Sequence, residues 1–164
     1  MRLTCRVFGV MLVGLVCAAP ARAETTAALA FYSAAAPRPA LAFAFGRAPR
    51  PVGFELEYAA TRGAPDEARR AIGSIQASLL VGTPLRVRRA RVYAILGVGA
   101  YGETGGGSNS ELLSAWHAGA GAAVPVTGPL RVRIEYRFIA IEEADARVAS
   151  RHPQRLSVGV SLGF

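Results

Sequence analysis

The residues of this sequence whose side chains could do chemistry together are gathered in one segment. Ser150 lies two residues before His152, and three acids, Glu142, Glu143 and Asp145, precede them. A serine, a histidine and a carboxylate can form a nucleophilic triad, in which the histidine takes the proton of the attacking hydroxyl. The same segment also has the composition of a polar surface loop. We therefore predict no catalytic residue, and a hydrolase that acts on lipid through His152 and Ser150 is the alternative.

No metal or cofactor site is predicted. The other histidine, His117, lies 35 residues before His152, and the two do not have the spacing of a zinc site. The stretch GETGGG, residues 102–107, lacks the lysine of a phosphate-binding loop. We expect His117 to face a polar interior.

Residues 1–23 have the pattern of a secretory signal peptide, with a basic start, an apolar run and the ending Ala-Arg-Ala. The apolar run is shorter than the roughly 20 residues of a spanning helix, and the valines before Cys17 do not match a lipid-attachment motif. Cleavage after Ala23 would leave one domain over 24–164. Cys5 and Cys17 both lie in the leader, so this domain has no disulfide or thiolate chemistry.

The chain is basic through arginine alone. All 19 basic residues are arginines, there are 11 acids, and the formal charge is +8. Removal of residues 1–23 leaves 16 arginines and a charge of +5. Such a balance can indicate nucleic-acid binding, but a signal peptide takes the chain out of the cytoplasm. We therefore expect no nucleic-acid partner and anionic lipid headgroups as the counter-charge.

The dominant hydrophobic period is two, which is the period of strands. In LRVRIEYRF, residues 130–138, five apolar residues alternate with four charged ones. The same alternation predicts eight strands, most of them about ten residues long, the length that crosses a bilayer when tilted. They cover residues 25–34, 39–46, 52–61, 72–82, 91–102, 113–124, 130–139 and 155–164.

Apart from the first, over residues 35–39, the connections between these strands alternate in length. Those after the second, fourth and sixth strands are the shorter ones, over residues 47–51, 83–90 and 125–129. Those after the third, fifth and seventh are longer and polar, over residues 62–71, 103–112 and 140–154. This predicts an all-β fold, an eight-stranded antiparallel up-and-down transmembrane β-barrel with both termini on the periplasmic side.

A soluble barrel of the lipocalin kind has the same alternation with its faces reversed. Two features favour the membrane. The residues opposite the apolar face are repeatedly glycine or serine in several strands, which suits the crowded interior of a small barrel. The aromatic residues also predict two membrane girdles. One contains Tyr58, Trp116, Tyr136 and Phe138 on the loop side, and the other contains Phe45, Phe54 and Phe164 on the periplasmic side.

Charged residues on the third and seventh strands face one another across such a barrel. We predict a lumen ionic cluster that closes the barrel, because buried charges are tolerated only when they are paired. Its members are Glu55, Glu57, Arg131, Arg133, Glu135 and Arg137.

Three stretches carry a resemblance to a known family. They are RVYAILGVGAYG (91–102), AWHAGAGAAVPVTGPLRVRIEYRF (115–138) and RLSVGVSLGF (155–164). The chain resembles the small outer-membrane β-barrels of the OmpA, OmpX and opacity-protein type. The resemblance implies that the last strand is the signal read by the outer-membrane assembly machinery, with Val160, Leu162 and Phe164 at its apolar positions. Leu162 and Gly163 depart from the Tyr and Arg that this family often has there.

From these observations we expect a monomeric protein of the Gram-negative outer membrane with a closed lumen and no cofactor. Its partners would be outer-membrane lipid, lipopolysaccharide and the assembly machinery. Its role would be structural or one of surface interaction, such as adhesion, through the loops. The alternatives are the lipid-modifying hydrolase and a soluble periplasmic barrel that binds an apolar ligand.

Overall fold

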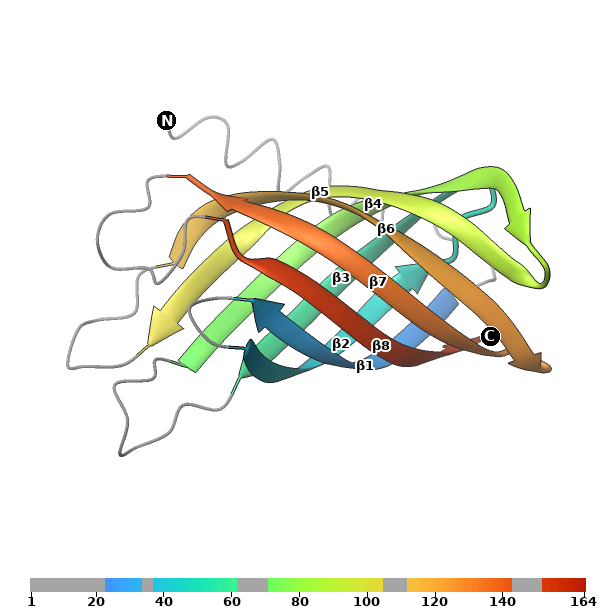
Figure 1. Cartoon of the computed structure of the whole chain (residues 1–164), viewed down its shortest axis with the longest axis horizontal. Coiled ribbons are helices and arrows are strands. Elements are labelled where there is room, and N and C mark those ends of the chain that lie inside the picture. Colours follow the sequence, from blue (N-terminus) through green and yellow to red (C-terminus); the bar gives the residue numbers. More distant parts are fainter. Residues whose placement is uncertain (1–22, 34–36, 62–70, 105–111, 143–151) are drawn as a thin grey trace.

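Eight antiparallel strands form a closed barrel in the computed structural model, which describes residues 23–33, 37–61, 71–104, 112–142 and 152–164 (Figure 1). The predicted fold class is confirmed. The strands are β1 (Ala23–Ser33), β2 (Pro37–Arg47), β3 (Val52–Thr61), β4 (Ala71–Val87), β5 (Ala90–Thr104), β6 (Leu112–Thr127), β7 (Leu130–Ile141) and β8 (Gln154–Gly163). Within the described ranges, no helix is long and apolar enough to span a bilayer.

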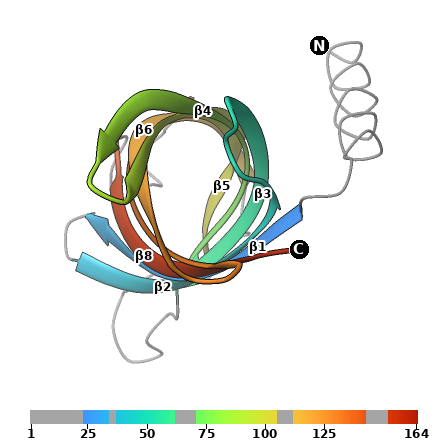
Figure 2. The same ribbon diagram turned by 90° about the vertical axis from the view of Figure 1, so that its right-hand side faces the viewer.

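Each strand pairs with its neighbours in sequence, and β1 pairs with β8 to close the ring (Figure 2). The closing register is staggered. A row of paired residues that begins at Gln154 returns to the end of β8 at Phe164, ten residues further along the chain. The row passes through Phe138, Ala118, Leu96, Leu79, Phe54, Arg47 and Ala23. Such a stagger requires the strands to tilt by about 35–45° from the barrel axis.

The two ends of the barrel differ. One, the turn end, carries the β2–β3, β4–β5 and β6–β7 turns together with Ala23 and Phe164, whose backbones are hydrogen-bonded at 2.9 Å. The opposite, loop end receives the connections over residues 34–36, 62–70, 105–111 and 143–151, which lie outside the described residues.

The period-two pattern sorts side chains between the two faces of the wall. On β7, Arg133, Glu135 and Arg137 are buried, while Ile134 and Tyr136 between them are exposed. On β8, buried Ser157 and Ser161 alternate in the same way with exposed valines and leucines. The polar side chains therefore fill the lumen and the apolar ones form the outer surface.

Two connections are shorter than predicted. The segment 83–90 is mostly strand, and only Arg88 and Arg89 form the turn. Pro84 lies beyond Val81, the last residue of β4 that pairs with β3, so its missing N–H interrupts no ladder on that side. The segment 125–129 also becomes strand as far as Thr127, and the turn needs only Gly128 and Pro129, with Gly128 at a φ of +51°.

The lumen is filled in layers. A cluster toward the loop end contains Tyr32, Ile72, Tyr101, Ile139 and Ile141 with neighbouring alanines. A smaller cluster toward the turn end contains Leu80, Tyr93 and Ile95. Charged side chains occupy the space between these two apolar layers.

Candidate functional site: the lumenal ionic cluster

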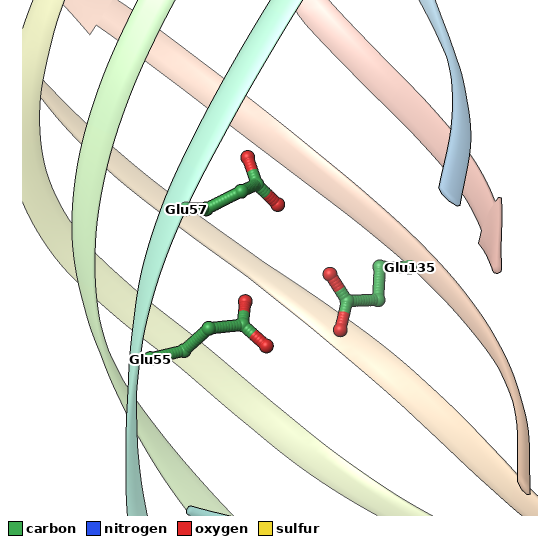
Figure 3. A group of neighbouring side chains, drawn as sticks. All are labelled: Glu55, Glu57 and Glu135. Atoms are coloured by element: carbon green, nitrogen blue, oxygen red, sulfur yellow. The ribbon is translucent and has the colours of Figure 1, made fainter. Parts of the chain in front are cut away.

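Three glutamates converge at the centre of the barrel. Glu55 and Glu57 project inward from β3, and Glu135 projects inward from β7, which lies across the ring (Figure 3). Their carboxylate oxygens lie within 4.8 Å of one another. Such an arrangement is stable only with positive charge between the carboxylates.

Arg137 supplies that charge from β7. Its Nη2 lies 2.7 Å from Glu55 Oε1, 2.7 Å from Glu135 Oε2 and 3.3 Å from Glu57 Oε2. Its Nη1 donates to Gln76 Oε1 at 3.1 Å. Arg137 is completely buried, so no solvent replaces these contacts.

Two further arginines complete the pairing. Arg133 bonds Glu55 Oε2 at 2.6 Å and also contacts Glu135. Arg155, from β8, bonds Glu57 Oε2 at 2.7 Å and makes a second contact with Oε1 of the same carboxylate. The lumenal cluster is therefore Glu55, Glu57, Glu135, Arg133, Arg137 and Arg155, three negative and three positive charges.

Neutral polar groups hold the edges of the lumenal cluster. Tyr93 donates to Glu135 Oε1 at 2.6 Å and accepts from Arg133 Nε at 3.0 Å. Arg133 Nη1 also donates to Thr26 Oγ1 at 2.8 Å, which brings β1 into the network. The lumenal cluster and these neighbours thus join β1, β3, β4, β5, β7 and β8.

His117 faces the lumen beside the cluster. Its Nε2 lies 2.9 Å from Ser78 Oγ, within hydrogen-bond distance. Its ring occupies the space over Gly97, where an added Cβ would lie 2.6 Å from the imidazole and 2.2 Å from the carbonyl oxygen of Ala77. Glycine at position 97 is thus what allows the imidazole to fit.

The structure separates one predicted member from the cluster and adds another. Arg131 lies at the turn end, half-buried, and pairs with Glu24 at 3.2 Å instead of with the β3 glutamates. Its inward direction was predicted, but the strand tilt carries it below the level of Glu55. The sequence does not mark Arg155 as a member, because it is the first residue of the predicted last strand and follows a predicted loop. Its even spacing from Ser157 and Ser161 is the signal that places it inside.

The three carboxylates do not form a free cation site. Hard cations such as Ca²⁺ and Mg²⁺ use carboxylate oxygens, but each of these carboxylates is already bonded to at least two groups. The three guanidinium groups also oppose a further positive charge. The arrangement fits a structural ionic network.

The lumenal cluster leaves little open space inside the described barrel. A cavity of about 10 Å³ lies between Thr26, Glu57 and Glu135, room for about one water molecule. The apolar layers on both sides close the lumen further.

The predicted girdle residues project outward. Tyr58, Trp116, Tyr136, Phe45 and Phe164 are exposed, and Phe54 and Phe138 are half-buried. The rings of Trp116 and Phe138 lie 6.2 Å apart. Phe31 and Phe43, which were not assigned to a girdle, are also exposed. Val160, Leu162 and Phe164 project outward from β8 and its end.

The possible triad is not brought together in the described part of the chain. Ser150, Glu143 and Asp145 lie outside the described residues. His152 is exposed, and its ring stacks on that of Phe138 at 5.5 Å.

Several solved structures are similar to this chain over nearly their whole length. Neisserial surface protein A superposes with a TM-score of 0.65 at 19% identity, over 87% of this chain and 96% of that one. The N-terminal barrel domain of Pseudomonas aeruginosa OprF gives 0.63 at 18% identity, over 87% and 97% of the two chains. Ail, the attachment invasion locus protein of Yersinia pestis, gives 0.52 at 13% identity, over 87% and 97%.

This chain has the fold of the small outer-membrane β-barrels. The predicted resemblance is confirmed at the level of the fold. No protein-family model and no curated protein sequence matches the chain.

Proposed function

We propose that this chain is a monomeric β-barrel protein of a Gram-negative outer membrane, exported with residues 1–23 as a signal peptide. One observation carries the proposal, the inversion of the usual burial pattern. The outer wall exposes large apolar residues on all eight strands, while the lumen buries three ion-paired arginines. The exposed apolar residues include Leu29, Phe43, Leu56, Leu79, Leu96, Trp116, Ile134 and Val158. A surface this apolar is stable in hydrocarbon and aggregates in water.

The soluble alternative is disfavoured by the same pattern. A barrel that carries an apolar ligand needs an apolar cavity, whereas the cavity within the lumenal cluster has the size of one water molecule. The larger cavity of about 340 Å³ at the turn end is lined by Glu24, Arg47, Arg50 and Arg131 among others, so it is charged and not apolar. In the proposed orientation, the turn end faces the periplasm and the loop end faces outward. Val160, Leu162 and Phe164 would then form the assembly signal at the periplasmic end of β8.

The proposed role is structural or one of surface interaction, through contact with lipopolysaccharide, host or ligand. The connections at the loop end would make these contacts, over residues 62–71, 103–112 and 140–154, most of which lie outside the described residues. Ail, a protein of the same fold, has been solved with the heparin analogue sucrose octasulfate. The closed lumen supports a role that does not depend on transport.

Cell fractionation with gel mobility tests the proposal. The protein should collect with outer membranes, and its unheated sample should migrate differently from a boiled one, because the barrel resists detergent until it is heated. Recovery in the soluble periplasmic fraction would overturn it. Purified protein that deacylates lipid A or hydrolyses esters, with the activity lost in His152→Ala, would replace the non-catalytic role with the hydrolase.

A further inference from the structure

The β4–β5 hairpin extends beyond its neighbour β3 at the turn end, at the right of Figure 1. The last β3–β4 pair is Val52 with Val81, and the last β5–β6 pair is Arg91 with Ala123. The hairpin itself continues to the pair Val87 and Ala90, after a register shift beyond Gly82. Its tip is therefore paired within itself and open to its surroundings on the β3 side.

The outward apolar stripe of β4 continues into this tip. Leu79 and Val81 are exposed on the barrel wall, and Leu85 and Val87 are each 65% exposed on the extension. On an ordinary water-facing hairpin, the outward positions beyond the wall would be polar. The stripe therefore indicates that the tip also contacts an apolar phase.

The stripe ends at positive charge. Arg88 and Arg89 form the turn, Arg91 is the second residue of the return strand, and all three are exposed. None of the three makes an ion pair within the described part of the chain. Residues 71–102 contain no acid at all, and the one acid described at the turn end, Glu24, is buried against Arg131. The three guanidinium groups thus lack a protein counter-charge where the apolar stripe stops.

We propose that the β4–β5 hairpin is a binding site for anionic phospholipid in the periplasmic leaflet, an inference that rests on the proposed outer-membrane location. Leu85 and Val87 contact the upper acyl chains. Arg88, Arg89 and Arg91 bind the phosphate groups, since a guanidinium matches phosphate oxygens with two parallel hydrogen bonds.

The chemistry favours lipid over a soluble polyanion. A polyanion in the periplasm would be held by the three arginines alone, and Leu85 and Val87 would then be exposed without a partner. A phospholipid has an acyl chain and a phosphate group next to each other, as the hairpin has apolar residues next to arginines. The acyl chain would lie beside Leu85 and Val87, and the phosphate beside Arg88, Arg89 and Arg91. Each arginine near an anionic lipid surface strengthens binding roughly fivefold, so three together give on the order of 100-fold.

The test is native mass spectrometry of the folded, detergent-solubilised full chain titrated with dimyristoylphosphatidylglycerol, with dimyristoylphosphatidylcholine as the neutral reference. The wild type should bind phosphatidylglycerol in preference. Arg88→Gln, Arg89→Gln and Arg91→Gln together should weaken that binding by at least tenfold and leave phosphatidylcholine unchanged. The matched control is Arg62→Gln, Arg69→Gln and Arg70→Gln, which removes the same charge from the connection between β3 and β4 and should retain the preference.

A second variant, Leu85→Ser with Val87→Ser, keeps every arginine and should also weaken phosphatidylglycerol binding severalfold. Equal weakening by the control triple variant would overturn the proposal, because bulk charge would then explain the preference. The hairpin would instead be a site for soluble polyanions if two results came together. Leu85→Ser with Val87→Ser would bind phosphatidylglycerol as tightly as the wild type does, and the wild type would bind inositol hexakisphosphate as tightly as it binds phosphatidylglycerol. Heat-shifted mobility of each variant confirms that it is folded.

The wild type distinguishes this inference from the proposed function. A wild type that fractionates with outer membranes but shows no lipid preference would overturn this inference alone. A wild type in the soluble periplasm would overturn the proposed function.

Discussion

Arg137 should be the most sensitive position of the lumenal cluster. It is completely buried and contacts all three glutamates, at 2.7 Å from Glu55, 2.7 Å from Glu135 and 3.3 Å from Glu57. Arg137→Met retains an apolar stem of similar length and removes the charge. The cluster then holds three carboxylates and two guanidinium groups, with one negative charge uncompensated. Breaking a buried pair in this way costs about 3–5 kcal/mol of unfolding free energy.

A second substitution separates charge balance from packing. Arg137→Met combined with Glu135→Gln returns the cluster to two positive and two negative charges. Because the two side chains are in direct contact, the double variant should be more stable than the sum of the single losses predicts, by about 0.5–3 kcal/mol. Additive losses would indicate that the pair does not interact energetically.

Urea unfolding of the barrel in lipid vesicles measures these differences, with the fluorescence of Trp116, the single tryptophan, as the probe. With an m-value of about 2 kcal/mol per molar urea, Arg137→Met should lower the midpoint by roughly 2 M. Arg89→Met, at the exposed β4–β5 turn, is the control. In vesicles of neutral phosphatidylcholine, which offer no anionic lipid to the hairpin, it should change the unfolding free energy by less than about 0.5 kcal/mol. If Arg137→Met unfolds at the wild-type midpoint, as the control does, the lumenal cluster does not stabilise the barrel.

Three further predictions test the wall and the assembly signal. Gly119→Ala should lower the free energy of unfolding by about 1–3 kcal/mol, because an added Cβ would lie 2.1 Å from the carbonyl oxygen of Tyr136. Gly73→Ala is its control, since a Cβ there meets nothing within 4 Å, and equal urea midpoints would contradict the steric argument. Leu96→Arg, in the middle of β5, should lower the free energy of unfolding in vesicles by about 2–4 kcal/mol. Leu112→Arg, at the loop end of β6, should lower it by only about 0–1 kcal/mol. Equal losses would mean that Leu96 does not face lipid. Phe164→Ala should reduce the heat-shifted protein in outer membranes while the purified chain refolds normally in detergent, and normal assembly in cells would remove Phe164 from the signal.

The strand pattern could be predicted because its cause is local. Successive side chains of a strand point to opposite faces. A strand between lipid and a polar lumen therefore has apolar and polar residues in alternation, which is a period of two in the sequence. Predicted strands such as 52–61 and 130–139 therefore lie within two residues of the observed ones. The exceptions are the extensions to Val87 and Thr127. Prolines and glycines mark turns reliably, but whether a strand continues through Pro84 or Pro125 depends on which neighbour it still pairs with.

Much of the lumenal cluster was also predictable, since Glu55, Glu57, Arg133, Glu135 and Arg137 all have inward spacing on opposing strands. Spacing gives the face of a side chain and not its height along the barrel. The ten-residue stagger of the ring decides that height, and it arises only from pairing all eight strands. The stagger takes Arg131 to Glu24 at the turn end and brings Arg155 level with Glu57.

The sequence by itself thus determined the number of strands, the inner and outer faces, and the apolar exterior that suits a membrane. Only the tertiary structure decided which charges meet, how completely the lumen is filled, and how far the β4–β5 hairpin reaches past the wall. The physical reason is that alternation is a property of each strand alone, whereas these contacts depend on the closed ring that all the strands make together.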